Sequence, residues 1–136
     1  MLSSLRPDPA CRALVALALA LPAATALGQA RCRVEPFNGA SQPTGAVAQM
    51  SVVNDVKYCA ITNFGIPGER RNPADSGTVL VAPSHGKAVF VAPQVQYTPE
   101  PGYVGEDEFQ YEAWARGNIN QQIRMLVTVK VTVRAP

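Results

Sequence analysis

The sequence predicts an all-β protein, an antiparallel β-sandwich of about seven strands that follows an N-terminal signal peptide. Three observations support this fold class. Apolar and polar residues alternate with a period of two in several short segments, most clearly over residues 123–134, as in strands that bury one face. Glycine, proline and asparagine separate these segments. After residue 30, no segment has the apolar periodicity of an amphipathic helix.

Residues 1–30 are typical of a secretory signal peptide. Arg6 and Arg12 supply positive charge before an unbroken apolar run, residues 13–21, which is too short to span a bilayer. Small residues follow, and the later of two acceptable cleavage sites ends at Ala30. A buried N-terminal helix is the alternative interpretation. Export predicts one domain, residues 31–136, in the periplasm or at the cell surface.

The charge of this domain argues against some classes of partner. Removing the signal peptide takes Arg6 and Arg12 from the 12 basic residues and Asp8 from the 10 acidic residues, so 10 and 9 remain and the net charge is +1. That balance gives no basis for binding nucleic acid or an anionic membrane. No second apolar segment is long enough to span a bilayer.

Cys32 and Cys59 are the cysteines of the predicted domain, and an even pair in an exported chain predicts a disulfide. A metal pair or a redox pair is the alternative. Neither has support, because the two cysteines lack CxxC spacing and His85 is the only histidine. Cys59 shares a strand face with Ile61, so we expect it to point inward.

The first half of the domain is expected to contain two strands and two irregular segments. Residues 31–45 are polar and rich in turn formers, which predicts an extended segment held by the disulfide. Residues 46–53 and 57–63 are candidate strands, separated by the turn signal Asn54-Asp55. Residues 64–77 contain prolines, glycines and acids, which predicts the longest and most mobile loop.

Arg70 and Arg71 lie in that loop, where we expect solvated side chains, with a binding loop as the alternative. Two short apolar segments follow, residues 78–82 and 87–92, on either side of a turn that contains His85. Their spacing predicts a β-hairpin.

The last three strands are expected over residues 94–98, 108–115 and 123–134, after or between loops rich in glycine and proline. In the last of these, the odd-numbered residues are apolar and the even-numbered residues are mostly polar, with Leu126 as the exception. That alternation places the odd-numbered side chains in the core.

A string of residues in the C-terminal half matches a known motif, a His-Gly turn followed by Tyr-x-Pro-x-x-Gly-Tyr-x-Gly-x-Asp-x-Phe-x-Tyr. The matching residues are Pro83, His85, Gly86, Tyr97, Pro99, Gly102, Tyr103, Gly105, Asp107, Phe109 and Tyr111. From about residue 77 onward the chain thereby resembles bacterial immunoglobulin-like and cadherin-like repeat domains of exported proteins. The resemblance implies an immunoglobulin-like β-sandwich, present here as a single domain and not in tandem.

The motif residues also have physical roles in the fold. Gly102 and Gly105 allow backbone angles that a side chain disfavours. Asp107 is expected to accept hydrogen bonds from nearby backbone amides and fix the loop. Phe109 and Tyr111 are expected in the core, with the Tyr111 hydroxyl bonded back to that loop as in a tyrosine corner. These roles bear on the fold and not on chemistry.

No catalytic residue, cofactor or metal is predicted. His85 is expected to be a turn residue, because the sequence lacks a nucleophile motif such as GxSxG. The acidic residues lack the spacing of a calcium site or of a glycosidase carboxylate pair, and we expect them to be solvated. These are Glu100, Glu106, Asp107, Glu108 and Glu112.

Trp114 shares the parity of Glu108 and Glu112, which predicts an outward-facing tryptophan and hence a binding surface. Arg116 and Asn118, at the adjacent turn, extend this surface. A bulge that turns Trp114 inward, or cover by residues 31–45, is the alternative. The sequence therefore favours an exported, non-enzymatic binding or structural module with a protein or cell-surface partner. A calcium- or carbohydrate-binding accessory domain of a surface assembly is the second hypothesis.

Overall fold

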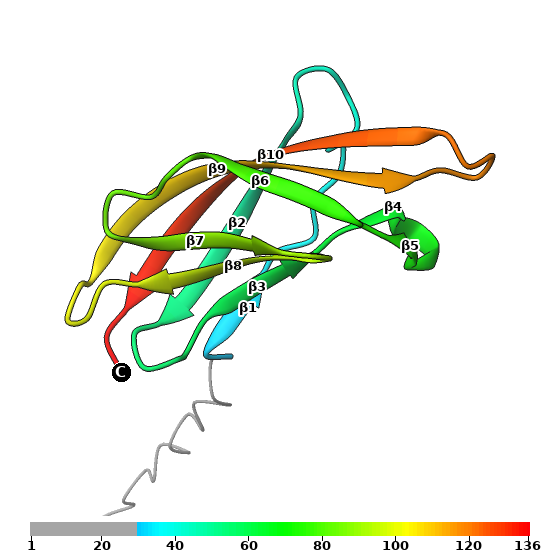
Figure 1. The fold of residues 1–136 in the computed structure, drawn as a ribbon. Coiled ribbons are helices and arrows are strands. Elements are labelled where there is room, and N and C mark those ends of the chain that lie inside the picture. The colour runs from blue at the N-terminus through cyan, green and yellow to red at the C-terminus, as the bar shows by residue number, and fades with distance from the viewer. Residues whose placement is uncertain (1–29) are drawn as a thin grey trace, which may run out of the picture.

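The structure is a computed structural model that describes residues 30–136, and the all-β prediction is confirmed for them. The predicted signal peptide lies outside the described residues except for Ala30. Two sheets lie face to face (Figure 1). The larger has the order β1 (Cys32–Val34), β2 (Ala46–Val53), β10 (Gln122–Arg134), β9 (Gly105–Arg116) and β6 (Ser76–Val81). The smaller has the order β3 (Cys59–Thr62), β8 (Gln94–Pro99) and β7 (Gly86–Val91).

The strand pairs are antiparallel with one exception, since β2 runs parallel to β10. This parallel pair departs from the purely antiparallel prediction. β2 occupies one edge of β10, and the other edge of β10 pairs with β9 from Gln122 to Val133. The immunoglobulin-like topology suggested by the motif stays a prediction.

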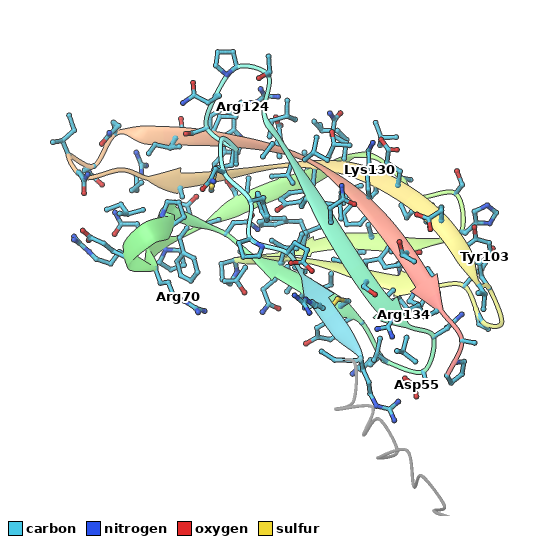
Figure 2. The ribbon with its side chains drawn as sticks, turned by 180° about the vertical axis from the view of Figure 1, so that it is seen from behind. Asp55, Arg70, Tyr103, Arg124, Lys130 and Arg134 are labelled. Atoms are coloured by element: carbon cyan, nitrogen blue, oxygen red, sulfur yellow. A yellow bond between two sulfur atoms is a disulfide. The ribbon has the colours of Figure 1, made fainter. Side chains whose placement is uncertain are left out.

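The alternation of β10 sets one wall of the core, as predicted. Val127, Val129 and Val131 are fully buried, while Lys130 points to solvent from the outer face (Figure 2). Leu126 does not interrupt the pattern. It is partly buried on the outer face, where its backbone and side chain pass close to Gly45. A Cβ at Gly45 would lie 2.6 Å from the Leu126 carbonyl oxygen, and the φ of Gly45 is +72°, so this contact requires glycine.

Aromatic side chains fill the space between the two sheets. Tyr97 of β8 stacks on Phe109 of β9 with ring centroids 5.6 Å apart, and Phe109 lies 6.3 Å from Tyr111. All three are almost completely buried. Such contacts add to the free energy gained from burying the rings, so this stack joins β8 to β9 across the core.

The predicted hairpin over residues 78–92 is wrong. β6 pairs with β9 in the larger sheet and β7 pairs with β8 in the smaller, so the chain changes sheets between them. The two strands meet through side chains. A Cβ at Gly77 would lie 2.6 Å from the Phe90 ring, so β6 approaches β7 closely because residue 77 has no side chain. Spacing along the chain could not distinguish this corner from a hairpin.

The predicted mobile loop over residues 64–77 is also ordered differently. It contains β4 (Phe64–Ile66), the 3₁₀ turn η1 (Pro67–Glu69) and β5 (Arg71–Pro73), with β4 paired to β5. A Cβ at Gly65 would lie 2.0 Å from the Arg116 carbonyl oxygen. The Asn72 side-chain amide donates to the same carbonyl at 2.9 Å. These contacts hold the small hairpin against the end of β9.

The predicted disulfide between Cys32 and Cys59 is present, with Cα atoms 5.3 Å apart. Cys59 is fully buried, as expected for a structural bond. The disulfide joins β1 to β3, which are the edge strands of the larger and the smaller sheet. One long side of the molecule is therefore closed by a cross-link, and the opposite side is closed by the β6–β7 corner.

Candidate functional site

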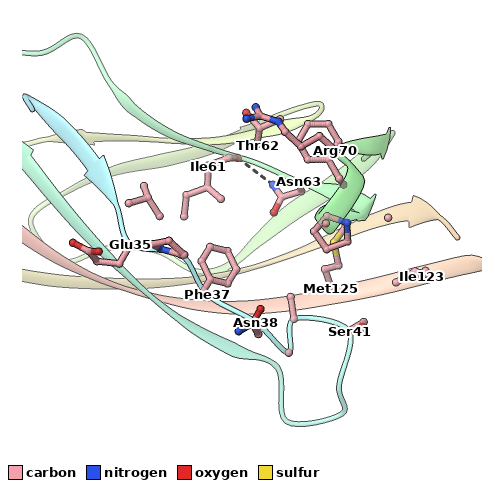
Figure 3. Close-up of a pocket in the computed structure, with 18 of the residues that line it drawn as sticks. Glu35, Phe37, Asn38, Ser41, Ile61, Thr62, Asn63, Arg70, Ile123 and Met125 are labelled. Atoms are coloured by element: carbon pink, nitrogen blue, oxygen red, sulfur yellow. Dashed lines mark hydrogen bonds between the residues drawn. The ribbon is translucent and has the colours of Figure 1, made fainter.

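A groove of about 720 Å³ opens beside the edge strand β3, between this strand and the loop that follows β1 (Figure 3). We call residues 35–41 the N-terminal loop. Together with β3, the β4–η1 segment and the start of β10, this loop lines the groove. The volume lies within the ~300–1,000 Å³ typical of ligand sites. The sequence pattern did not indicate this site, because its walls come from two segments interpreted as irregular.

The floor of the groove is apolar. Ile61 and Met125 are buried members of the core, and Phe37 packs against that core from the N-terminal loop. The loop is fixed at both ends of its course. The Glu35 amide donates to the Gln49 carbonyl at 3.0 Å, and the Ala40 carbonyl accepts from the Leu126 amide at 2.8 Å.

The β3 edge of the groove offers unpaired backbone groups. The Asn63 amide donates to the Pro93 carbonyl at 3.1 Å, so the odd-numbered residues of β3 occupy the hydrogen-bonded positions opposite β8. In an antiparallel pair the intervening residues point their N–H and C=O groups away. These are Ala60 and Thr62, which both line the groove. Within residues 30–136 their backbone groups have no hydrogen-bond partner.

Arg70 stands at one end of the groove. Its guanidinium lies over the Phe64 ring, 5.6 Å from the centroid, and its backbone has φ 53° and ψ 44° as it ends η1. Among the described residues Arg70 forms no ion pair, whereas its neighbour Arg71 pairs with Glu69 at 2.7 Å. Because the backbone is left-handed at Arg70, the side chain of Arg70 lies at the groove and that of Arg71 does not.

Asn63, a buried residue of the groove lining, is hydrogen-bonded to Tyr111 of the core. The Tyr111 hydroxyl donates to Asn63 Oδ1 at 2.7 Å, and Asn63 Nδ2 donates to the carbonyls of Ile61 and Pro93 at 3.1 and 3.2 Å. Burial raises the pKa of Tyr111 well above its usual value, although the hydrogen bond to Asn63 acts in the opposite direction. The expected bond from Tyr111 to the loop at residues 99–107 is wrong, because Asn63 is its partner across the core.

Asp107 organises the opposite end of the molecule, as predicted for a loop-setting residue. It accepts hydrogen bonds of 2.9 Å from the amides of Ser84 and Glu108, 3.1 Å from the His85 amide and 2.7 Å from the Tyr97 hydroxyl. Burial, together with the hydrogen bond to Asp107 and its charge, raises the pKa of Tyr97 far above its usual value. Tyr97, not Tyr111, therefore ties the core to this loop.

The other motif residues support this end. Tyr103, at the opposite end of the molecule from Arg70 (Figure 2), stacks on His85 with centroids 4.1 Å apart. Gly102 and Gly105 have φ of +79° and +142°, values that favour glycine. His85 Nδ1 lies 3.8 Å from Glu100. Gly86 lies against the Tyr97 ring, which a Cβ at residue 86 would approach to 2.7 Å.

The outer face of β9 holds the residues predicted to bind a partner. Trp114 is half-buried and keeps its outward parity, because the β9–β10 register is unbroken; the bulge alternative is therefore wrong. Its direct neighbour Arg124 forms an ion pair with Glu112 at 2.7 Å. Glu108 lies earlier on the same face of β9, about 20 Å from Trp114 at ~3.3 Å per residue, while Asn118 lies in the turn after β9.

Arg116, the last residue of β9, shares the parity of Glu108, Glu112 and Trp114 and is exposed on the same outer face. Its guanidinium donates to the Asn120 carbonyl at 3.4 Å within the β9–β10 turn. Asn118 is exposed in the same turn. The structure therefore places Glu112, Trp114 and Arg116 in succession on the outer face beside Arg124, with Glu108 farther along β9 and Asn118 in the turn that follows.

The acidic residues are spread over several surfaces. Asp107 points inward, while Glu106 accepts a hydrogen bond from Thr132 and Glu112 pairs with Arg124. In the part of the chain that the structure describes, no three His, Cys, Asp or Glu side chains are placed to hold a metal ion. Over the same residues no helix has the length and hydropathy needed to cross a membrane.

Comparison with protein-family models, with curated proteins and with solved structures finds no match to this chain.

Proposed function

We propose that this chain is an exported, non-enzymatic immunoglobulin-like module that binds a protein partner in the groove beside β3. One observation carries the proposal. Within residues 30–136, the groove combines an apolar floor, backbone groups without hydrogen-bond partners and an Arg70 guanidinium without an ion-pair partner on one concave surface. Binding sites commonly have such a composition, with apolar walls and a few polar groups that fix orientation.

The disulfide supports the same function. It joins β1 to β3 beside the groove, whose lining includes Val34 of β1 and Ala60 of β3, and disulfides persist in oxidising, extracytoplasmic compartments. A cross-linked frame keeps the two groove walls at a fixed spacing, which lowers the entropy lost on binding.

The outer face of β9 is the second candidate surface. The specific observation in its favour is a half-buried Trp114 on a sheet face, since tryptophan is enriched among residues that dominate binding energy. The calcium- or carbohydrate-binding alternative has less support, because the acidic residues are separated and several already have protein partners.

Export is tested by N-terminal sequencing of the protein recovered outside the cytoplasm. The expected first residue lies between Gln29 and Arg31. Recovery of chains that retain Met1 would contradict the signal-peptide prediction.

Groove binding is tested by photocrosslinking in cells that export the protein. Benzoylphenylalanine replaces Asn38, an exposed residue of the groove wall, or Trp114 on the outer face, or Val47 as an exposed control. Covalent adducts with another protein are expected from position 38 alone. Adducts from position 114 alone would move the interface to the outer face, and equal yields at 38 and 47, including none, would overturn the proposal.

A further inference from the structure

We propose that the groove recognises an extended peptide segment that carries a carboxylate, which adds as a strand to the free edge of β3 and forms an ion pair with Arg70. This inference rests on the proposed function and names the chemistry of the partner. Three features of the groove lead to it, namely the strand edge, the alternate side-chain positions and the Arg70 guanidinium, which has no ion-pair partner among residues 30–136.

The first feature is the unprotected edge of β3. Proteins commonly protect edge strands with lysine, proline, a bulge or a covering segment, since free N–H and C=O groups attract other strands. β3 consists of Cys-Ala-Ile-Thr, and its pairing with β8 shows no bulge. The edge strands β6 and β7 contact each other at the corner described above, so each covers the other, unlike the edge of β3.

The backbone groups of Ala60 and Thr62 provide the donors and acceptors for an added strand. They are spaced two residues apart on the same side of β3, as the free-edge groups of an edge strand are. Both residues are half-buried and line the groove. In a partly buried groove, water hydrates these N–H and C=O groups only in part. The backbone of an extended peptide can supply the remaining hydrogen bonds.

The apolar floor fits the side chains of such a segment. Successive side chains of a strand point to opposite faces, so every second residue of an added strand would face Ile61, Phe37 and Met125, while the others face solvent. The four residues of β3 can pair with a segment of about four to six residues. An alternating apolar and polar sequence is therefore expected.

Arg70 sets the charge of the segment. Its guanidinium is held over Phe64 at the end of the groove and has no carboxylate partner among residues 30–136. A planar guanidinium binds a carboxylate with two parallel hydrogen bonds. The nearest basic neighbour in sequence, Arg71, is already paired with Glu69, so Arg70 alone selects for an Asp or Glu side chain, or for a terminal carboxylate, at that end.

The experiment starts with a library of random heptapeptides displayed on phage, panned against the exported, disulfide-bonded protein. Enriched peptides are synthesised and titrated into ¹⁵N-labelled protein. We expect alternating apolar sequences with one acidic residue. In the complex, the amides of Ala60 and Thr62 should show the largest chemical-shift changes and slower exchange with solvent.

Two matched comparisons test each contact. Arg70→Gln should weaken peptide binding about tenfold. Arg71→Gln, which removes the same charge at the adjacent residue, should leave the affinity unchanged. A peptide N-methylated at the residues that face Ala60 and Thr62 should lose binding, while methylation at the intervening residues should not. Thermal melts of both variants check that the fold is retained.

Several outcomes would overturn the inference. Equal effects of the two arginine variants would contradict the ion pair with Arg70. Ala60 and Thr62 amides that still exchange rapidly in the complex would contradict strand addition. A library that yields no groove binder, when position 38 still crosslinks to a partner, would show that groove binding is correct and the extended-peptide mode is wrong. If neither experiment gives a contact, the proposed function itself fails.

Discussion

The two long sides of the molecule are closed by different means. On one side the chain itself passes from β6 to β7, and Gly77 allows the Phe90 ring to pack directly against β6. On the other side β1 and β3 are joined at one point by the Cys32–Cys59 disulfide, and the groove opens beyond it (Figure 3). The corner brings the two sheets into direct contact at Gly77 and Phe90, while the cross-link closes only the part of the edge nearest to it.

The difference shows where a small β-protein can hold a binding site without weakening its core. β1 has three residues and β3 has four, so the sheets cannot extend their edges along the whole side. The N-terminal loop covers part of the gap with Phe37. The remaining strand edge and the adjacent apolar residues stay accessible while the cross-linked frame keeps its shape.

One hydrophobic core supports both sides of the molecule, and the largest expected effect comes from a substitution that disrupts this core. Val129 is fully buried in the middle of β10. Val129→Asp should unfold the domain, because burying an unpaired carboxylate costs several kcal/mol of the ~5–15 kcal/mol available to a domain. Lys130→Asp, on the outer face, should change stability by less than ~1 kcal/mol. Urea titration followed by circular dichroism measures both, and equal losses would show that the face assignment is wrong.

Removing the disulfide should release the groove side selectively. The cysteines are separated by 27 residues, for which loop-closure entropy predicts a loss of about 3–4 kcal/mol in the Cys32→Ser/Cys59→Ser protein. Amide exchange of β1 and β3 should accelerate far more than that of β6 and β7. Uniform acceleration across both sides would contradict the view that the cross-link acts on one side.

Tyr97→Phe tests the end of the molecule organised by Asp107. Loss of the 2.7 Å bond to this buried carboxylate should cost about 1.5–3 kcal/mol at neutral pH, as expected for hydrogen bonds to charged groups. Tyr58→Phe, at an exposed position, is the matched control and should be nearly silent. Chemical denaturation of the two variants measures the difference.

The same substitution should change the response to alkali. The pKa of Tyr97 and of Tyr111 is raised above the ordinary 10.0, so above about pH 10 the unfolded chain loses phenolic protons that the folded chain keeps. Their contribution is complete below pH 10, and stability then falls by ~1.4 kcal/mol per pH unit for each tyrosine. Tyr97→Phe should halve this part of the slope. An unchanged slope relative to Tyr58→Phe would contradict it.

Of the four variant proteins, Gly77→Ala should have the smallest effect on stability, and this effect should fall on the β6–β7 side. A methyl group there would lie 2.6 Å from the Phe90 ring and 2.7 Å from the Glu112 carbonyl oxygen, and overpacking of this kind costs ~1–3 kcal/mol. Gly68→Ala is the control, since no atom lies within 4 Å of the added Cβ. Binding in the groove should survive Gly77→Ala, which thermal melts and peptide titration can establish together.

The sequence alone determined which side chains face the core. Period-two alternation predicted the inward set of β10 and the outward parity of Trp114, because side-chain direction in a strand is a local property. Cys32 and Cys59, the even pair of cysteines in the predicted domain, indicated the disulfide that the structure contains. Asp107 was predicted to fix its loop because a short carboxylate accepts hydrogen bonds from amides nearby in sequence and in space.

The tertiary structure alone decided which strands pair and therefore where the groove lies. Alternation shows that a face is buried but not which strand lies beside it, so the corner between β6 and β7 was predicted as a hairpin. Arg70 and Arg71 are equivalent in the sequence, and a left-handed turn at Arg70 brings only one of them to the groove. Strand pairing and loop placement depend on contacts between residues far apart in the chain, which no local pattern records.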